Sequence, residues 1–220
     1  MGTPTGERRY GGKSAEERRA ERRERLLDTG LELFGTRGYA GTSIELLCAE
    51  AGLNARYFYE EFETRERLLQ AVYDRHIDHV FAAVLAAVDA AAPHPAERLR
   101  AGLTTFVDQT LADPRAARVN YFEIVGVSSA LEARRREVLA RYAEMVGSQF
   151  AQLLGPGTPP PGGDLHLAAV ALVSATDGLI IDRLSDAGGA AAGPEDRLRI
   201  VTSLLGIFGA ALTAPPAPGH

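Results

Sequence analysis

The polar side chains best suited to recognise another molecule lie between residues 42 and 62. Arg56 carries a guanidinium whose paired donors can bind two acceptors of a guanine base in the major groove of DNA, and Tyr57 follows it directly. Thr42 and Ser43 precede a predicted helix, where hydroxyl and amide groups can hydrogen-bond phosphate. We predict that Arg56 and Tyr57 read base edges and that Thr42 and Ser43 contact phosphate. The alternatives are a solvated helix start for the first pair and simple helix capping for Thr42.

Two short helices separated by a glycine turn must position these side chains. Thr42 and Glu45 have the spacing of a capping box for the first helix, Gly52 ends it, and Asn54 caps the second, predicted over 55–62. Both helices can bury apolar side chains against the helix before them: Ile44, Leu47, Leu53 and Phe58 against Leu31 and Phe34. This is the outline of a helix-turn-helix, whose second helix can enter a major groove. Its free face carries Ala55, Arg56, Tyr57, Tyr59 and Glu60.

The whole chain has a helical pattern, with apolar residues at three- and four-residue spacing and little β-branched alternation. It predicts an all-α fold with an N-terminal three-helix domain containing the helix-turn-helix, followed by a larger C-terminal helical domain. We expect a disordered arm at 1–13, the first domain at 14–63, the second at 64–213 and a disordered tail at 214–220. The predicted helices begin at caps such as Ser14, Asn54, Thr64 and Asp113, and one of them covers 114–127.

Composition excludes several classes of protein. The 220 residues contain a single cysteine, so no intramolecular disulfide is expected, and no run of about 18 uncharged apolar residues. We predict a cytoplasmic protein with no membrane partner. The sequence has no glycine-rich phosphate loop, nucleophile elbow or paired metal motif, which argues against an enzyme and predicts no cofactor and no metal.

The net charge of −5 counts against a nucleic-acid partner only until it is divided along the chain. Residues 1–75 hold 13 basic and 14 acidic residues, whereas residues 76–220 hold 11 and 15. Residues 1–25 alone hold eight basic and five acidic residues. Two interpretations of this segment stay open: a basic arm that follows the DNA duplex, and a solvated helix whose charges pair with one another.

In the C-terminal part, polar and aromatic residues embedded in apolar helices are the candidates for a ligand pocket. They are Tyr73, His76, Phe106, Asn120, Tyr121, Glu123 and Asp177. Taken singly, each is more often a surface or core residue than a ligand contact. The last two helices, at about 164–185 and 194–212, are apolar over so much of their circumference that we predict a four-helix dimer interface; an internal core alone is the alternative.

The segment from Leu26 to Leu69 resembles the DNA-binding domain of the TetR family of transcriptional regulators. The resemblance rests on AlaGluAlaGlyLeu at 49–53, TyrPheTyrGluGluPhe at 57–62 and ThrArgGluArgLeuLeu at 64–69, and it covers residues 14 to 75. Beyond that, only the length and the number of helices match. The resemblance implies that Tyr59 touches backbone phosphate and that Arg65 meets phosphate as well. Where the family often has Tyr-His before the last Phe, this chain has Glu60 and Glu61, which either point away from DNA or offer Glu60 to a cytosine amino group.

The resemblance further implies a homodimer that binds a near-palindromic operator and responds to a small molecule held by its C-terminal ligand-binding and dimerisation domain. The function expected is that of a repressor released from DNA by its effector. The alternative is a helical small-molecule-binding or interaction protein whose helix-turn-helix is vestigial, for which Glu60 and Glu61 are the best support.

Overall fold

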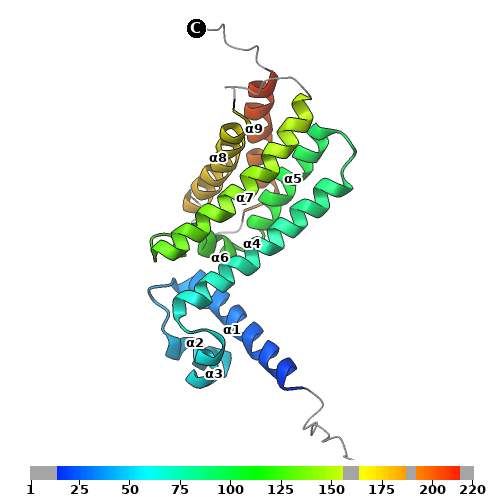
Figure 1. The fold of residues 1–220 in the computed structure, drawn as a ribbon. Coiled ribbons are helices and arrows are strands. Elements are labelled where there is room, and N and C mark those ends of the chain that lie inside the picture. Colours follow the sequence, from blue (N-terminus) through cyan, green and yellow to red (C-terminus); the bar gives the residue numbers. More distant parts are fainter. Residues whose placement is uncertain (1–13, 156–163, 187–191, 214–220) are drawn as a thin grey trace, which may run out of the picture. The chain divides into compact units, whose positions relative to one another are not determined.

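A computed structural model describes residues 14–155, 164–186 and 192–213. The predicted arm at 1–13 and tail at 214–220 lie outside these ranges. Every regular element of the described residues is helical, so the predicted all-α fold is confirmed (Figure 1). The elements are α1 (Ala15–Arg37), α2 (Ile44–Ala51), α3 (Ala55–Glu61), α4 (Arg65–Ala90), α5 (Pro95–Thr110), α6 (Pro114–Arg118), the π-helix η1 (Val119–Glu123), α7 (Ser129–Leu154), α8 (Leu165–Asp186) and α9 (Pro194–Thr213).

The helix α1 begins at Ser14, the predicted cap, where a capping box forms. The Ser14 side chain accepts a hydrogen bond from the Glu17 backbone N–H at 3.0 Å, and the Glu17 carboxylate accepts one from the Ser14 N–H. Two otherwise unpaired donors at the helix start are thereby satisfied. At the other end, Gly38 takes a positive φ of 84° and lets the chain turn toward α2.

The cap of α2 is Ser43, so the predicted capping box of Thr42 and Glu45 is wrong by one residue. Ser43 Oγ accepts a hydrogen bond from the Leu46 N–H at 3.2 Å. Thr42 is fully buried, and its hydroxyl donates to the Gly38 carbonyl at 2.8 Å. Thr42 and Ser43 both carry a hydroxyl that could cap α2. Ser43 is the cap because the turn after α1 buries Thr42.

The helices α2 and α3 form the predicted helix-turn-helix. Gly52 ends α2 in the left-handed region (φ 62°, ψ 39°), which a residue with a Cβ atom enters at a cost of roughly 1–2 kcal/mol. Asn54 then caps α3 as predicted, with its side-chain oxygen accepting from the Tyr57 N–H at 3.1 Å. Leu47 and Phe58 have no exposed surface and lie in the core that α1, α2 and α3 share.

The chain divides into two compact units between Val72 and Tyr73, inside α4, whereas the predicted boundary was between residues 63 and 64. The start of α4 belongs to the first core because α1 approaches it closely at Gly30. A Cβ atom on Gly30 would lie 3.0 Å from Val72 Cγ2 and 3.3 Å from Leu68 Cγ. The second unit, from Tyr73 onward, is described by itself below.

In the second unit α7 packs along α8 and α5, and α9 packs on α5 and α8 (Figure 1). Their shared core includes Leu103, Val107, Phe150, Leu172, Ile180 and Leu204. The end of α5 is tied to α9 by Arg197, whose guanidinium donates to the Leu111 carbonyl at 3.1 Å. These helices enclose the cavities considered below.

The prediction of a single helix over 114–127 is wrong for the second half of that range. Asp113 does cap α6, accepting from the Arg115 N–H at 2.9 Å. The chain then widens into the π-helix η1, after which the Ile124 N–H bonds the Val119 carbonyl at 3.2 Å. Turns of π-helix recur at functional sites. No feature of the local sequence predicts η1. It leaves Asn120 only 7% exposed.

The helices α8 and α9 keep large apolar side chains exposed on their surface. Leu167 and Ile181 on α8 and Leu198 and Ile207 on α9 are between 36% and 67% exposed. By length and composition alone α8 could cross a bilayer, with a mean hydropathy of 1.5, but a helix of a soluble protein can pass the same test. Apolar surface of this kind is typical of an interface with another protein.

Candidate functional sites

The exposed face of α3 carries the side chains predicted to read DNA. Tyr59 is 57% exposed, and the Arg56 side chain is 83% exposed. Glu60 holds Arg56 through an ion pair, with 2.9 Å between Oε1 and Nε. An exposed pair at this helical spacing contributes about 0.3–0.5 kcal/mol, whereas a good bidentate contact with guanine is worth about 1–3 kcal/mol. A guanine base can therefore take Arg56 from Glu60 at little cost.

Arginines of α1 reach across to the helix-turn-helix. Arg19 Nε lies 3.1 Å from Oε1 of Glu61, whose side chain is only 2% exposed, so this carboxylate is turned away from solvent. Two further arginines place their guanidinium carbons 4.5 Å from aromatic ring centres: Arg22 over Tyr57 and Arg23 over Phe62. The three arginines form an arginine clasp (Arg19, Arg22 and Arg23) that holds α3 against α1.

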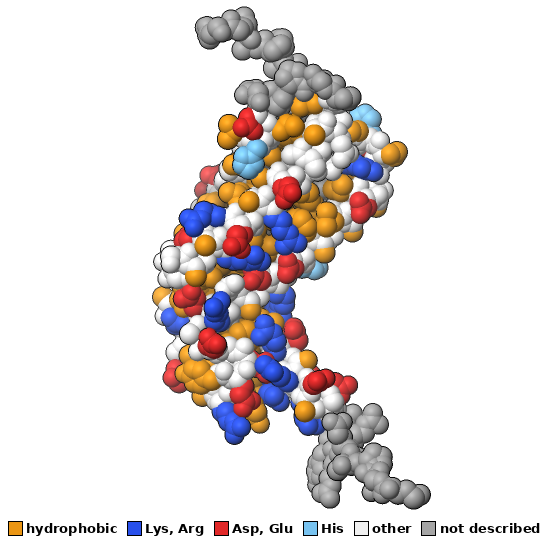
Figure 2. Space-filling view, in the orientation of Figure 1, with side chains coloured by type: hydrophobic (Ala, Val, Ile, Leu, Met, Phe, Trp, Pro, Cys, Tyr) orange, Lys and Arg blue, Asp and Glu red, His pale blue; other side chains and the backbone are white. Residues whose placement is uncertain are grey.

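Neither interpretation of residues 1–25 anticipated the arginine clasp. The signal was present, because positions 19, 22 and 23 lie on one face of a helix. The sequence does not indicate that α3 lies opposite this face of α1. On the visible surface of this unit, arginine and acidic side chains are interspersed (Figure 2).

Three other predicted DNA contacts lie around the start of α2. Ser43 is exposed at the cap. Thr42 is withdrawn from the predicted set, because its hydroxyl donates to the Gly38 carbonyl and its amide to the Tyr39 carbonyl. Arg65 donates to the Thr42 carbonyl and stacks over Tyr39, with 4.2 Å to the ring centre. Arg65 thus fixes the turn between α1 and α2, and its contact with phosphate stays a prediction.

A polar cavity of about 150 Å³ lies in the second unit, between α4, α5, η1, α7 and α8. Six of the seven predicted ligand residues line it: Tyr73, His76, Phe106, Asn120, Tyr121 and Asp177. The seventh, Glu123, does not line it, and its Oε1 lies 2.8 Å from Arg118 Nε. These six residues come from four elements, α4, α5, η1 and α8, and α7 completes the wall.

Several buried atoms of this cavity have no hydrogen-bond partner among the described residues. They are His76 Nε2, Asn120 Oδ1 and the Tyr142 hydroxyl. Unpaired buried polar atoms cost about 1–3 kcal/mol each, so their convergence on one cavity favours a polar ligand that bonds them.

Burial shapes the protonation of the groups around the polar cavity. It lowers the pKa of His76 to about 4, with a smaller contribution from nearby His79, so the imidazole is neutral at pH 7. Burial also raises the pKa of Asp177, opposed by the hydrogen bond that Tyr121 donates to its Oδ1 at 3.0 Å. The pKa of Tyr73 is raised as well, chiefly by burial. The cavity thus offers the neutral side chains of His76 and Tyr73 beside Asp177, and Glu132, Arg135 and Arg136 add ionisable groups to its wall.

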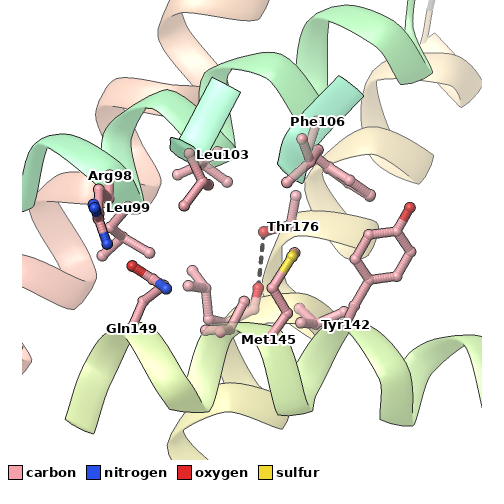
Figure 3. Close-up of a pocket in the computed structure, with 14 residues that line it drawn as sticks. Arg98, Leu99, Leu103, Phe106, Tyr142, Met145, Gln149 and Thr176 are labelled. Carbon is pink, nitrogen blue, oxygen red and sulfur yellow. Dashed lines mark hydrogen bonds between the residues drawn. The ribbon is translucent and has the colours of Figure 1, made fainter. Parts of the chain in front are cut away.

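A second, apolar cavity of about 60 Å³ adjoins the first (Figure 3). Phe106, Tyr142 and Val173 line both cavities. The rest of its wall comes from α4, α5, α7 and α8 and is mostly aliphatic, including Val84, Leu99, Leu103, Val146 and Leu172. The two cavities thus share one wall, with polar side chains on one side of it and mostly aliphatic side chains on the other.

None of the predicted ligand residues lies on α7, although this helix contributes to both cavities. Arg135, Val138, Leu139, Tyr142, Met145, Val146 and Gln149 line one cavity or the other. Their spacing of three and four residues marks one helical face, but the same pattern describes any core-facing helix, so it could not be recognised as a cavity wall.

The described residues hold no group of three or more His, Cys, Asp or Glu side chains placed to bind a metal. The acidic residues near His76 have arginine partners instead. Asp74 lies 2.8 Å from Arg134, and Asp78 lies 3.2 Å from Arg141.

Replacing Asp177 with Asn is expected to raise the melting temperature of the second unit at pH 7. Because the folded-state pKa of Asp177 is raised, its contribution to stability is fully present only below the unfolded pKa and is lost as the pH rises through the folded value. The amide removes a buried charge and can still accept from Tyr121. Thermal melts at pH 7 and pH 5 measure the effect, which shrinks at the lower pH.

Two controls bracket this variant. Asp182→Asn, at an exposed position of the same helix, should leave the melting temperature unchanged. Asp177→Leu leaves the Tyr121 hydroxyl without its acceptor and should cost about 1–3 kcal/mol. An Asp177→Asn protein that melts below the wild type at pH 7 would show that the charge is compensated.

Comparison with known protein families adds two matches. The profile described as "Bacterial regulatory proteins, tetR family" matches residues 26–72, which hold the helix-turn-helix. The profile described as "BetI-type transcriptional repressor, C-terminal" matches residues 95–206, which hold most of the walls of both cavities. Together the two matches cover both units.

Individual relatives are more distant. The chain is 26% identical over 147 residues to the "HTH-type transcriptional activator FasR" of Mycolicibacterium smegmatis, covering 56% of this chain and 67% of that protein. Two further curated relatives are matched over only 20% and 42% of their own lengths.

Two solved structures have a similar fold. A transcriptional regulator FadR from Bacillus subtilis in complex with stearoyl-CoA superposes with a TM-score of 0.71 at 15% identity, covering 86% of this chain and 97% of that one. AibR, in complex with isovaleryl coenzyme A and operator DNA, superposes with a TM-score of 0.63 at 20% identity, covering 84% and 97%. At these identities the likeness concerns the fold.

Proposed function

The chain belongs to the TetR family of DNA-binding transcriptional regulators, which are not enzymes, and from that premise we propose that it is a cytoplasmic repressor released from its operator by an acyl-CoA thioester. The observation that carries the effector class is the pair of adjoining cavities, one polar with unpaired buried atoms and one apolar. Two proteins of similar fold are described in complex with acyl-CoA molecules.

The chemistry of an acyl thioester suits the two cavities. Its acyl chain fits the aliphatic walls, and the carbonyl and amide groups that follow the chain can bond the unpaired atoms of His76, Asn120 and Tyr142. Arg135 and Arg136 on α7, beside the polar cavity, would face the phosphate groups. Each cavity is smaller than the roughly 300–1,000 Å³ of typical ligand sites, so binding has to separate the helices around it. That movement is the proposed source of the allosteric signal.

The proposed repressor is a homodimer formed through α8 and α9. The exposed apolar side chains of these two helices support this, because a twofold axis would cover each set with its copy. A dimer can place two recognition helices in successive major grooves, roughly 34–36 Å apart, on a near-palindromic operator. In another form of the dimer the two recognition helices would be too far apart or too close to enter successive major grooves. A thioester that stabilises that form over the DNA-binding form by about 1–3 kcal/mol would release the DNA.

The DNA contacts proposed for α3 predict two different losses. Arg56→Ala should reduce discrimination for the operator by about 1–3 kcal/mol, because a base contact is removed. Tyr59→Phe should weaken binding to operator and random DNA alike, because it removes a proposed phosphate contact and the side chain is exposed. Titrations of both variants against both DNAs measure this, and equal losses for both variants on both DNAs would contradict the assignment.

A mobility-shift assay with the DNA around the protein's own gene tests the proposed function. The expected result is a salt-sensitive shift that butyryl-CoA or a longer acyl-CoA reverses, whereas CoA alone does not. Absence of any shift would favour the alternative of a small-molecule-binding protein with a vestigial helix-turn-helix. A thioester that strengthens the complex instead would indicate an activator, as the name of the relative FasR describes that protein.

A further inference from the structure

The unpaired polar atoms of the apolar cavity lie at its two ends. Tyr142 lies at the end shared with the polar cavity, and Arg98 and Gln149 lie at the other end (Figure 3). Between them the one hydroxyl in the wall, that of Thr176, already donates to the Leu172 carbonyl at 2.8 Å. An acyl chain that enters from the polar cavity would therefore meet aliphatic walls first and polar atoms at its tip.

Those polar atoms at the tip are unsatisfied. Arg98 Nε and Gln149 Oε1 are both buried, and neither has a hydrogen-bond partner among the described residues. Figure 3 shows the two side chains facing each other from α5 and α7. A methyl group placed between them would leave a buried donor and a buried acceptor unpaired, which is the costly arrangement.

We propose that this end of the cavity is a subsite for a terminal oxygen, carried as a carboxylate or hydroxyl at the far end of the effector's acyl chain. A hydroxyl can accept from Arg98 Nε and donate to Gln149 Oε1. A carboxylate can accept from Arg98 and, once the Gln149 amide rotates, from its NH₂ group. The inference rests on the proposed function, since it assumes that an acyl thioester enters the cavity.

The size of the apolar cavity limits the chain length. Its volume of about 60 Å³ is well below the 150 Å³ of an engineered cavity that holds benzene. A chain of about four carbons is therefore the first to try. Matched probes of that length are succinyl-CoA, with a terminal carboxylate, 4-hydroxybutyryl-CoA, with a terminal hydroxyl, and butyryl-CoA, with a methyl end.

Calorimetric titration of the full-length protein with the three thioesters tests the subsite. We expect succinyl-CoA or 4-hydroxybutyryl-CoA to bind about tenfold more tightly than butyryl-CoA. Whichever of the two binds more tightly identifies the terminal group, carboxylate or hydroxyl, that the subsite prefers. Butyryl-CoA binding as tightly as both oxygenated probes would overturn the inference.

Variants at the subsite separate recognition from folding. Arg98→Met with Gln149→Leu keeps the side chains long while removing both polar atoms, and it should reverse the preference toward butyryl-CoA. Arg100→Met, at an exposed position of the same helix, should leave the preference unchanged. Should the double variant lose its fold, the single Gln149→Leu must still narrow the ratio between the probes; an unchanged ratio would contradict the subsite.

The failure of this inference differs from failure of the proposed function. If all three thioesters release operator DNA equally, the repressor function stands and the subsite falls. If none of them binds while the operator shift persists, the effector class and the subsite fall together, and DNA binding stands. If the operator shift itself is absent, the repressor function fails, and the calorimetric ratios still decide the subsite.

Discussion

Lowering the pH from 7 to 4 is expected to remove about 3 kcal/mol from the free energy of unfolding of the second unit through His76 alone. The pKa of His76 is about 4 in the folded protein, against 6.5 for an ordinary histidine. A base with a lowered folded pKa contributes stability that is present above the unfolded pKa and is lost as the pH falls through the folded one. A difference of about 2.5 pH units corresponds to about 3 kcal/mol, at 1.36 kcal/mol per unit.

The measurement is denaturant unfolding at several pH values, together with NMR titration of the imidazole. In His76→Gln the pH dependence between 7 and 4 should flatten by about the same amount, because the side chain no longer takes up a proton on unfolding. His166→Gln, at an exposed position on α8, should leave it unchanged. An imidazole that titrates near 6.5 in the native protein would show that water or an ion reaches His76.

The same histidine gives a readout of the effector. Its Nε2 is one of the unpaired atoms of the polar cavity, so a bound thioester that donates a hydrogen bond to it or excludes water from it would shift the imidazole signal. The observed change then reports occupancy of the polar cavity without any DNA being present.

The helix-turn-helix could be predicted from the sequence because its determinants are local. Asn54 caps α3 and Gly52 ends α2, each at a position where few other residues serve. The mistake at Thr42 and Ser43 shows the limit of local reasoning. Either hydroxyl can cap a helix, but the Thr42 hydroxyl donates to the Gly38 carbonyl in the preceding turn, so Ser43 caps α2.

The walls of the two cavities could be predicted only in part, and for a similar reason. Polar residues within apolar helices face inward often enough that six of the seven candidates line one cavity. Glu123 does not line it, and it lies in η1, whose wide turn a regular 3.6-residue pattern does not contain. The polar end formed by Arg98 and Gln149 joins α5 to α7, and no spacing within either helix indicates that pairing.

Replacing Phe58 with Ala is expected to abolish specific DNA binding while leaving effector binding intact. Phe58 has no exposed surface and packs its ring 6.2 Å from that of Phe62. Truncation of a buried Phe costs about 3–5 kcal/mol, a large share of the 5–15 kcal/mol that stabilises a typical domain. The helix α3 would then no longer be held in place against α1.

The adjacent residue supplies the matched control. Tyr59→Ala, on the exposed face of the same helix, removes a ring whose centre lies 5.6 Å from that of Phe58. It should cost about 0.5–1.5 kcal/mol of unfolding free energy, well below Phe58→Ala, while it weakens binding to operator and random DNA alike. Because every residue lining the two cavities lies at or beyond Tyr73, both variants should bind the thioester with wild-type affinity. If Phe58→Ala loses the effector as well, the two units do not fold independently, and coupling between them includes stability as well as geometry.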